Sequence, residues 1–273
     1  MKPVAFEYAR PASVAEAVRM LRDNPEAKVL AGGQTLGPML NLRLAQPALL
    51  VDITRMAELA AVAQDADGVS IGAIVTHAAI EDGHVPDPTG GFLARVARGI
   101  AYRAVRTRGT VGGSLAHADP AADWLSCLAA LGAEALIASP QGSRRVPVAS
   151  LVRGAMATVL EAHELLAAVH IPRFSREARF GFHKVCRKTG EFAEAIGVAV
   201  HDPARGSTRL AASTPAGAPL VIDACDLQPG RGAPPDTAEM RRRLSAAGFA
   251  SDAHGLTLGA VALVRAFREM TGP

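Results

Sequence analysis

Two pairs of adjacent glycines, Gly32-Gly33 and Gly112-Gly113, constrain this chain more than any other feature of its sequence. Glycine has no side chain, so a large ligand can approach the backbone closely at each pair. The amides around the second pair, with the hydroxyl of Ser114, are donors of the kind that hold phosphate oxygens. A single loop of this kind is an ordinary tight connection between a strand and a helix. Two of them, far apart in the sequence, favour a long ligand whose diphosphate is enclosed from both sides.

The second glycine pair comes shortly before a predicted helix. Asp119 is placed to cap this helix, Pro120 to occupy its first position, and residues 121–131 to form it. The N-terminus of a helix attracts anions through its free amides and its dipole. We therefore expect residues 110–114 to form a small-residue loop beside a helix N-terminus, and this loop to face the ligand.

The N-terminal part of the chain alternates strands with helices. Ser13 and Glu16 form a capping box, and Ala17 and Leu21 belong to the apolar stripe of the helix that follows. Strands are predicted at 4–8, 28–30 and 48–53, and a second short helix at 38–44. This order predicts a compact α/β unit.

Further along the chain the alternation is less regular, which favours an α+β fold. Strands are predicted at 59–64, 68–71, 133–138, 144–148, 165–171, 180–186 and 195–200, helices at 77–81, 92–100, 236–247 and 256–270, and a loose segment at 207–219. We place the boundaries near residues 54–58 and 172–179. The chain then divides into regions 1–56, 57–174 and 175–273.

Several classes of function are disfavoured by what the sequence lacks. It has neither G-x-G-x-x-G nor G-x-x-x-x-G-K-[ST], which disfavours a Rossmann dinucleotide site and a P-loop nucleotidase. It has no G-x-S-x-G elbow, and its eight histidines show no metal-ligand spacing, so we assign no catalytic residue and no metal ligand. A formal charge of +3 with mixed signs and few aromatic residues argues against nucleic-acid binding.

The cysteines and the N-terminus suggest where the protein resides. Cys127, Cys186 and Cys225 are widely spaced, without a C-x-x-C pair, so we expect reduced thiols and no iron–sulfur cluster on this chain. We find no apolar signal-peptide region after Met1 and no apolar stretch of transmembrane length. The expected location is the cytoplasm.

Lys184 is the charged residue with the most interesting position outside the glycine segments. It sits on a predicted strand, followed by Arg187 and Glu191. Its plain interpretation is a surface lysine on an edge strand. A lysine near a redox cofactor would instead stabilise an anionic reduced form by placing positive charge beside it.

The motifs together resemble those of the FAD-binding medium subunits of molybdenum hydroxylases, the family of carbon monoxide dehydrogenase and xanthine dehydrogenase. The first flavin loop of that family is similar to Leu30-Ala31-Gly32-Gly33-Gln34-Thr35-Leu36, and its second is similar to the segment 100–123 with Arg108-Gly109-Thr110-Val111-Gly112-Gly113-Ser114. Val69-Ser70-Ile71-Gly72-Ala73 and Phe182-His183-Lys184 follow in the family's order. The resemblance covers about residues 1–201.

The resemblance implies an FAD-binding fold of the vanillyl-alcohol oxidase/MurB type, with two α/β subdomains and a small C-terminal α+β domain. It implies noncovalent FAD, with the diphosphate enclosed by Leu30, Ala31, Gly32, Gly33, Gln34, Thr35 and Leu36 on one side and by Thr110, Val111, Gly112, Gly113 and Ser114 on the other. By the same resemblance Ile100 would lie against the flavin, Asp123 would bind its ribityl or ribose part, and Lys184 would lie near the ring.

The resemblance also implies an electron-transfer subunit that is not a complete enzyme alone. Electrons would come from a molybdopterin-binding large subunit through a small subunit with two [2Fe–2S] clusters, in a dimer of heterotrimers. FAD would pass them to an acceptor. Ala104 and Thr107 stand where the family usually has Gln and Asn, the segment 210–219 lacks the family's Leu-Gly-Gly run, and Met240-Arg241 replaces a Tyr-Arg pair. Two alternatives therefore stay open: a flavin-free scaffold or assembly protein of the same fold, and an independent flavin oxidase.

Overall fold

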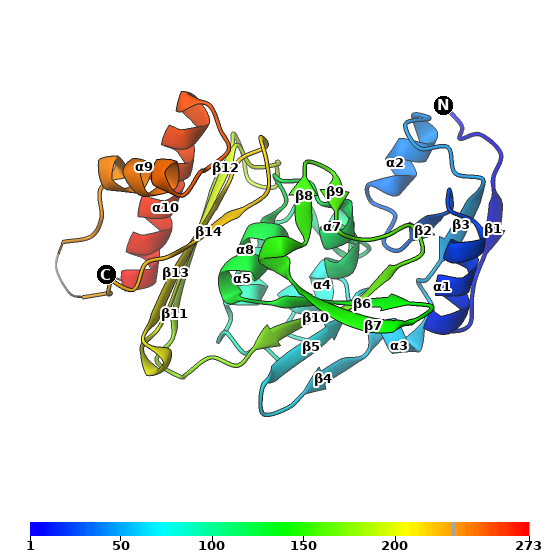
Figure 1. Ribbon diagram of the computed structural model, residues 1–273, viewed down its shortest axis with the longest axis horizontal. Helices are drawn as coiled ribbons and strands as arrows, with labels where there is room; N and C mark the ends of the chain where they lie inside the picture. The colour runs from blue at the N-terminus through cyan, green and yellow to red at the C-terminus, as the bar shows by residue number, and fades with distance from the viewer. Residues whose placement is uncertain (231–232, 273) are drawn as a thin grey trace.

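The computed structural model of the protein describes residues 1–230 and 233–272, and residues 231, 232 and 273 of the expected third region lie outside this description. Within the described residues, three larger sheets follow one another along the long axis of the molecule, and a fourth sheet has only two short strands (Figure 1). Helices and strands are mixed throughout, and the sheets are separate rather than continuous. The expected α+β class is confirmed.

The N-terminal unit is a small parallel sheet with strand order β1-β3-β2, covered by one helix. Ala17, Val18 and Leu21 on that helix are buried, so the predicted apolar stripe is confirmed. Ser13 caps the helix by accepting from the Glu16 amide at 3.2 Å. The elements are β1 Glu7–Ala9, α1 Val14–Asp23, β2 Lys28–Leu30, α2 Leu36–Asn41 and β3 Leu49–Asp52.

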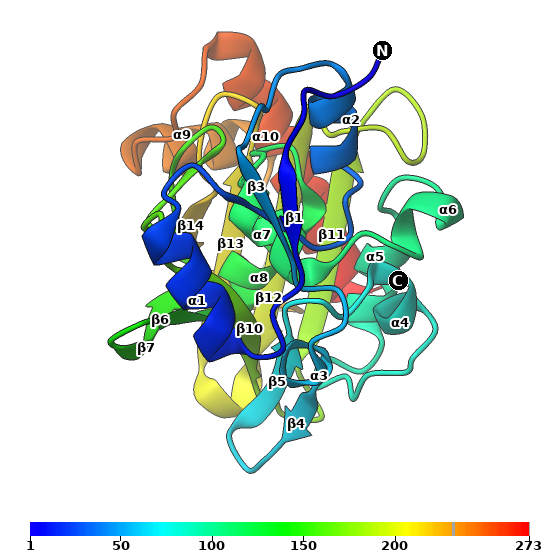
Figure 2. The same cartoon turned by 90° about the vertical axis from the view of Figure 1, so that its right-hand side faces the viewer.

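The middle unit is an antiparallel sheet with strand order β4-β5-β10-β6-β7 and a group of short helices on one face (Figure 2). The strands expected at 59–64 and 68–71 pair as one hairpin, and those expected at 133–138 and 144–148 pair as another. The helices are α3 Ala57–Ala60, α4 His77–Glu81, α5 Phe92–Arg98, α6 Arg103–Arg106, α7 Val111–His117, α8 Asp123–Leu131 and the 3-10 turn η1 Val148–Ser150. The strands are β4 Val62–Gln64, β5 Gly68–Gly72, β6 Glu134–Ser139, β7 Gly142–Pro147, the ribbon β8 Val152–Gly154 with β9 Ala157–Thr158, and β10 Leu165–Pro172.

The C-terminal unit is an antiparallel sheet with strand order β11-β12-β13-β14, against which the long helix α10 packs (Figure 1). Helix α8 of the middle unit packs against its other face, and all nine residues of α8 are buried. The hydrophobic core is therefore shared by the middle and C-terminal sheets. The elements are β11 Arg179–Val185, β12 Ala195–Asp202, η2 Pro203–Arg205, β13 Ser207–Ser213, β14 Leu220–Asp223, α9 Thr237–Ala246 and α10 Ala253–Thr271.

The segment 207–219, expected to be loose, begins with a central strand. Strand β13 lies between β12 and β14, and Leu210, Ala211 and Ala212 in it are fully buried. Its small residues give almost no alternating pattern in the sequence. Their strand conformation is imposed by the two neighbouring strands and by the helices that cover both faces. This expectation was wrong because the determining contacts are tertiary.

The helix predicted to begin at Pro120 begins at Asp123 instead, with Ala122 as its N-cap. Asp119 does accept a backbone hydrogen bond, from the Ala121 amide at 2.9 Å, but this closes a turn before the helix. Asp-Pro is as suitable for such a turn as for a helix N-terminus.

Two global expectations concern the membrane and the thiols. Among the described residues, no helix combines the length and the apolar character needed to cross a membrane. Cys127, Cys186 and Cys225 are all free thiols, and Cys127 is buried beside the core of the middle unit.

Candidate functional site

The two glycine segments lie in direct contact, although they are far apart in the sequence. A Cβ atom at Gly32 would lie 2.1 Å from the carbonyl oxygen of Arg108 and 2.8 Å from the Cα of Gly109. A Cβ at Gly113 would lie 3.8 Å from that of Ala31. The N-terminal unit and the middle unit therefore meet at the two glycine pairs, and glycine at position 32 is required by this close approach.

The first glycine segment, residues 31–36, joins strand β2 to helix α2. Gly33 has φ +70°, a conformation that favours glycine. The amides of Gly32, Gly33, Gln34 and Thr35 donate to no acceptor within the described part of the protein. Gln34 and Thr35 are exposed, so these donors are open to a ligand. A row of free amides is suited to a phosphate or another anion.

The second glycine segment, residues 110–114, is the first turn of helix α7 and not the expected loop. Thr110 is its N-cap, and its Oγ1 accepts from the Gly113 amide at 3.1 Å. The Val111 and Gly112 amides donate to the carbonyls of Val75 and Ala73, and the Ser114 amide donates to the carbonyl of Thr110. All four amides are therefore used inside the protein. Two adjacent glycines disfavour a helix, so local propensity alone gave the wrong prediction.

The two glycines of this helix have different surroundings. A Cβ at Gly112 would lie 2.5 Å from the Cβ of Ala73, so Gly112 is needed for packing inside the middle unit. At Gly113 the only atoms near such a Cβ are Thr110 Oγ1 at 2.8 Å and the Cβ of Ala31, so within the described residues Gly113 faces the first glycine segment. Ser114 is half-buried, and its hydroxyl makes no hydrogen bond to a described residue.

Asp123 and Lys184 form a buried ion pair that joins the middle and C-terminal units. The Lys184 Nζ lies 2.9 Å from Asp123 Oδ1, and the two side chains are 9% and 8% exposed. The ammonium also donates to the carbonyl of Gly99 at 2.8 Å, and among the described side chains Lys184 is the one paired with Asp123 Oδ1. Burial raises the pKa of Asp123, and the charge of Lys184 opposes that shift. Lys184 is thus not the surface lysine of the plain interpretation, although β11 is an edge strand.

The segment 99–101 lies between α5 and α6, and Ile100 in it is half-buried against the core. All three of its carbonyls accept from cationic side chains. Lys184 donates to Gly99, and Arg106 Nη1 donates to Ile100 at 2.9 Å and to Ala101 at 3.0 Å. Ala101 has φ +41°, a strained conformation for a residue other than glycine.

Arg106 is a site residue that the sequence analysis did not identify. It is buried, and its guanidinium makes a bidentate pair with Glu81 on α4, at 2.7 Å from Nε and 3.1 Å from Nη2. Arg103 also donates to Glu81, at 2.7 Å. Arginine is common on exposed helix faces, and nothing local in the sequence pairs residue 106 with residue 81. The available signal was the position of Arg106, four residues before Thr110, at which the second glycine segment begins.

His77 packs against Gly109, the residue directly before the second glycine segment. Its Nδ1 accepts from the Trp124 indole at 3.0 Å, and its amide donates to the carbonyl of Gly109 at 2.9 Å. A Cβ at Gly109 would lie 2.9 Å from the His77 ring. Burial, and secondarily the charge of Arg106, lower the pKa of His77 to about 4, so the ring is neutral at physiological pH. In the sequence, His77 is one of eight scattered histidines, and no local pattern links it to Trp124.

The predicted residues thus form two groups, linked by the chain between Gly99 and Gly109. One contains the two glycine segments, and the other contains Ile100, Asp123 and Lys184. Cavities of about 380 and 440 Å³ lie elsewhere, one beside α4 and α5 and one between α8, β10 and β13, and no predicted site residue lines them. No cluster of three metal-ligating side chains occurs in the described ranges.

These features fit a nucleotide cofactor that carries a diphosphate and hydroxyl groups. Four free amides at residues 32–35 suit the diphosphate, and the closely packed glycines leave room for it to approach the backbone. A carboxylate oxygen can accept more than one hydrogen bond, so the buried Asp123 Oδ1, paired with Lys184, can also accept from a ligand hydroxyl.

Comparison with known proteins gives a consistent result. Residues 4–174 match the family described as the FAD binding domain in molybdopterin dehydrogenase. The nicotine 6-hydroxylase medium subunit of Paenarthrobacter nicotinovorans is 34% identical over 266 residues, which are 93% of this chain and 92% of that protein. The 6-hydroxypseudooxynicotine dehydrogenase complex subunit alpha of the same organism is 37% identical over 71% of this chain, which spans 66% of that relative's length.

A solved structure extends the similarity over the whole chain. It is a carbon monoxide dehydrogenase from Hydrogenophaga pseudoflava that lacks the Mo-pyranopterin moiety of its cofactor, and it matches with a TM-score of 0.89 and 31% identity. The match covers 99% of this chain and 98% of the solved one. The C-terminal unit therefore follows the same architecture, although the segment 210–219 departs in sequence.

Proposed function

Because this chain belongs to the family of FAD binding domains in molybdopterin dehydrogenases, we propose that it is the FAD-carrying electron-transfer subunit of a molybdopterin-dependent hydroxylase or dehydrogenase complex. Its relatives are named as medium chains or subunits of dehydrogenase and hydroxylase complexes. The subunit would take electrons from [2Fe–2S] clusters on a partner and deliver them to an external acceptor. It would not oxidise the organic substrate itself.

The observation that carries the proposal is the contact between the two glycine segments, with free amides on only one of them. We assign the FAD diphosphate to the amides of Gly32, Gly33, Gln34 and Thr35. Gly113 leaves space for it from the opposite side, and the Ser114 hydroxyl is free to donate. Six further residues shape the walls: Leu30, Ala31 and Leu36 around the first segment, and Thr110, Val111 and Gly112, whose amides or side chains fix helix α7, around the second.

The second group of residues is assigned to the flavin and its ribityl chain. Ile100 offers an apolar surface to the ring, and Asp123 Oδ1 accepts from a ribityl or ribose hydroxyl. Lys184 places a positive charge beside Gly99 and next to Ile100. Bound FAD supplies the redox chemistry, since it can accept electrons singly and release them in pairs. The protein contributes binding, orientation and charge.

The proposal assigns the clusters and the molybdopterin to other subunits. The sequence has no cysteine spacing for an iron–sulfur cluster, and the part of the chain that the structure describes has no metal-ligating cluster. We propose a large molybdopterin subunit and a small [2Fe–2S] subunit as partners, in a dimer of heterotrimers. The free thiols are consistent with a cytoplasmic location, which belongs to this proposal as well.

The decisive experiment is to produce the full chain and titrate it with FAD, FMN and riboflavin, following the flavin absorption and fluorescence. We expect tight noncovalent binding of FAD and much weaker binding of the two ligands that lack a diphosphate. No binding of FAD would support the flavin-free scaffold instead. Reduction of the bound flavin by an organic substrate without partner subunits would support an independent oxidase.

A further inference from the structure

Helix α6 carries a buried arginine that controls the backbone beside Ile100. The Arg106 side chain is 10% exposed, and that of its partner Glu81 is 11% exposed. Helices α4 and α6 lie next to each other at one side of the middle unit (Figure 2). The bidentate pair with Glu81 uses Nε and Nη2 and leaves Nη1 to bind the carbonyls of Ile100 and Ala101. Glu81 therefore fixes the orientation in which Arg106 meets the backbone.

The two carbonyls held by Arg106 determine where two amides point. No peptide bond among the described residues is cis, so the C=O and N–H groups of each peptide point in opposite directions. The Ala101 and Tyr102 amides therefore point away from Arg106. Neither donates to an acceptor in the described residues. Arg106 thus orients two consecutive free donors.

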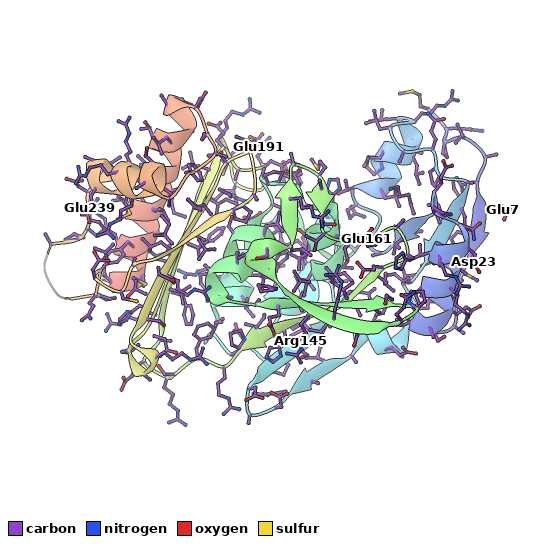
Figure 3. The ribbon with its side chains drawn as sticks, in the orientation of Figure 1. Glu7, Asp23, Arg145, Glu161, Glu191 and Glu239 are labelled. Carbon is purple, nitrogen blue, oxygen red and sulfur yellow. The ribbon has the colours of Figure 1, made fainter. Side chains whose placement is uncertain are left out.

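The backbone conformation of the segment 99–101 is strained, and the loop at Gly190 supports it in addition to Arg106 and Lys184. Ala101 has φ +41°, which costs energy for a side chain with a Cβ. Gly190, on the loop that carries Glu191 (Figure 3), approaches so closely that a Cβ there would lie 2.9 Å from the Ala101 carbonyl oxygen. A strained backbone conformation persists only where its surroundings hold it. Here a buried ion pair and a loop of the C-terminal unit do so.

We propose that Arg106 is a positioning residue for the flavin, acting through the peptides 100–101 and 101–102. This inference rests on the proposed function, which puts the flavin against Ile100. The Arg106–Glu81 pair would orient the Ala101 and Tyr102 amides to donate hydrogen bonds to the acceptor atoms of the flavin ring. The adjacent guanidinium also polarises both peptides, because a hydrogen bond to a carbonyl strengthens the donor at the other end of the same peptide group. Donors strengthened in this way favour the reduced, negatively charged flavin over the oxidised one.

The test compares Arg106→Met with Arg103→Met in the full chain loaded with FAD. Both variants remove one positive charge from α6 and one partner of Glu81, but Arg103 touches no carbonyl of the segment 99–101. The readouts are the flavin reduction potential and the dissociation constant of FAD. For Arg106→Met we expect the preference for reduced flavin to fall on the order of tenfold, about 30 mV for a two-electron couple. For Arg103→Met we expect the potential of the wild type.

Arg106→Lys covers the case in which Arg106→Met does not fold. Lysine keeps the charge opposite Glu81 but cannot make the bidentate pair and hold two carbonyls at once. We expect Arg106→Lys to fold and to have a flavin reduction potential between those of the wild type and Arg106→Met. If Arg106→Met does not fold, the expected result is a potential for Arg106→Lys below that of the wild type. A wild-type potential in Arg106→Lys and Arg106→Met, or equal shifts in the Arg103 and Arg106 variants, would overturn the inference. Failure of the wild type to bind FAD would instead overturn the proposed function.

Discussion

The backbone at Gly32 lies against the carbonyl of Arg108, which a Cβ atom at position 32 would approach to 2.1 Å. This contact joins the N-terminal unit to the segment that leads into helix α7. Because the carbonyl belongs to the backbone, it cannot rotate away as a flexible side chain could. The contact therefore makes the relative position of the two glycine segments sensitive to a single methyl group.

Gly32→Ala is expected to destabilise the protein by about 1–3 kcal/mol, as overpacking does elsewhere, and to lower its FAD content. Gly37→Ala is the matched control. Apart from its chain neighbours, a Cβ at Gly37 has nothing within 4 Å, so the variant tests a glycine of the same segment that makes no close approach. Thermal unfolding and the flavin-to-protein absorbance ratio measure both effects. Equal melting temperatures and flavin contents in the two variants would contradict the expected role of the contact.

Substitutions at Gly112 and at Gly113 are expected to have different effects, the first on stability and the second on FAD binding. Gly112→Ala puts a methyl group 2.5 Å from Ala73 Cβ and should lower the melting temperature of the flavin-free protein. Gly113→Val fills the side that faces Ala31 and should abolish FAD retention, at a smaller cost to the fold through the Thr110 cap. Calorimetry of the flavin-free variants separates a loss of fold stability from a loss of FAD binding. Full flavin occupancy in Gly113→Val would remove Gly113 from the proposed site.

Lys184→Met is expected to destabilise the protein by about 3–5 kcal/mol, because it leaves the Asp123 carboxylate buried without its counter-charge. Adding Asp123→Asn should restore part of this loss, since the neutral amide needs no counter-charge. A double-mutant cycle by urea denaturation therefore gives a coupling of about 1 kcal/mol or more. Strictly additive effects would show that the two side chains do not interact in solution.

The stability of the protein should depend on pH through His77. The folded-state pKa of about 4 lies below the ordinary histidine value, so the unfolded chain binds a proton first as the pH falls. The stabilisation is present above about pH 6.5, and about 3 kcal/mol of it is lost on acidification towards pH 4. His77→Asn, whose oxygen can still accept from Trp124, should reduce this slope between pH 6.5 and 5 and leave the part that comes from His183 and His201, whose pKa values burial also lowers. Trp124 is the sole tryptophan, so its fluorescence follows unfolding directly; an unchanged slope in the variant would contradict the assignment.

Local signals in the sequence predicted most of the N-terminal unit. The Ser13 cap, the stripe of α1 and the short strands follow from nearby residues, and the structure has them in place. The contact between the glycine segments also followed from their residue types, because such segments suggest a close approach. The family resemblance added the identity of the ligand, which the residues alone did not specify.

Contacts between distant residues decided the remaining features. Helix α7 forms in spite of two glycines because Thr110 caps it and the segment from Ala73 to Val75 accepts its first amides. Strand β13 depends on its neighbours in the sheet. The pairs Arg106–Glu81 and Trp124–His77 are separated by 25 and 47 residues, and neither leaves a periodic or spaced pattern. Such pairs leave no local trace in a single sequence.

The unequal use of amides in the two glycine segments has a consequence for hydrogen–deuterium exchange. The amides of residues 111–114 are bonded inside the protein, so their deuteration requires at least a local opening of helix α7. Those of residues 32–35 lack such bonds and should incorporate deuterium early. A diphosphate bound to these amides would slow exchange at residues 32–35 and leave exchange at residues 111–114 almost unchanged. The labelling pattern would therefore report which of the two glycine segments supplies hydrogen bonds to the ligand.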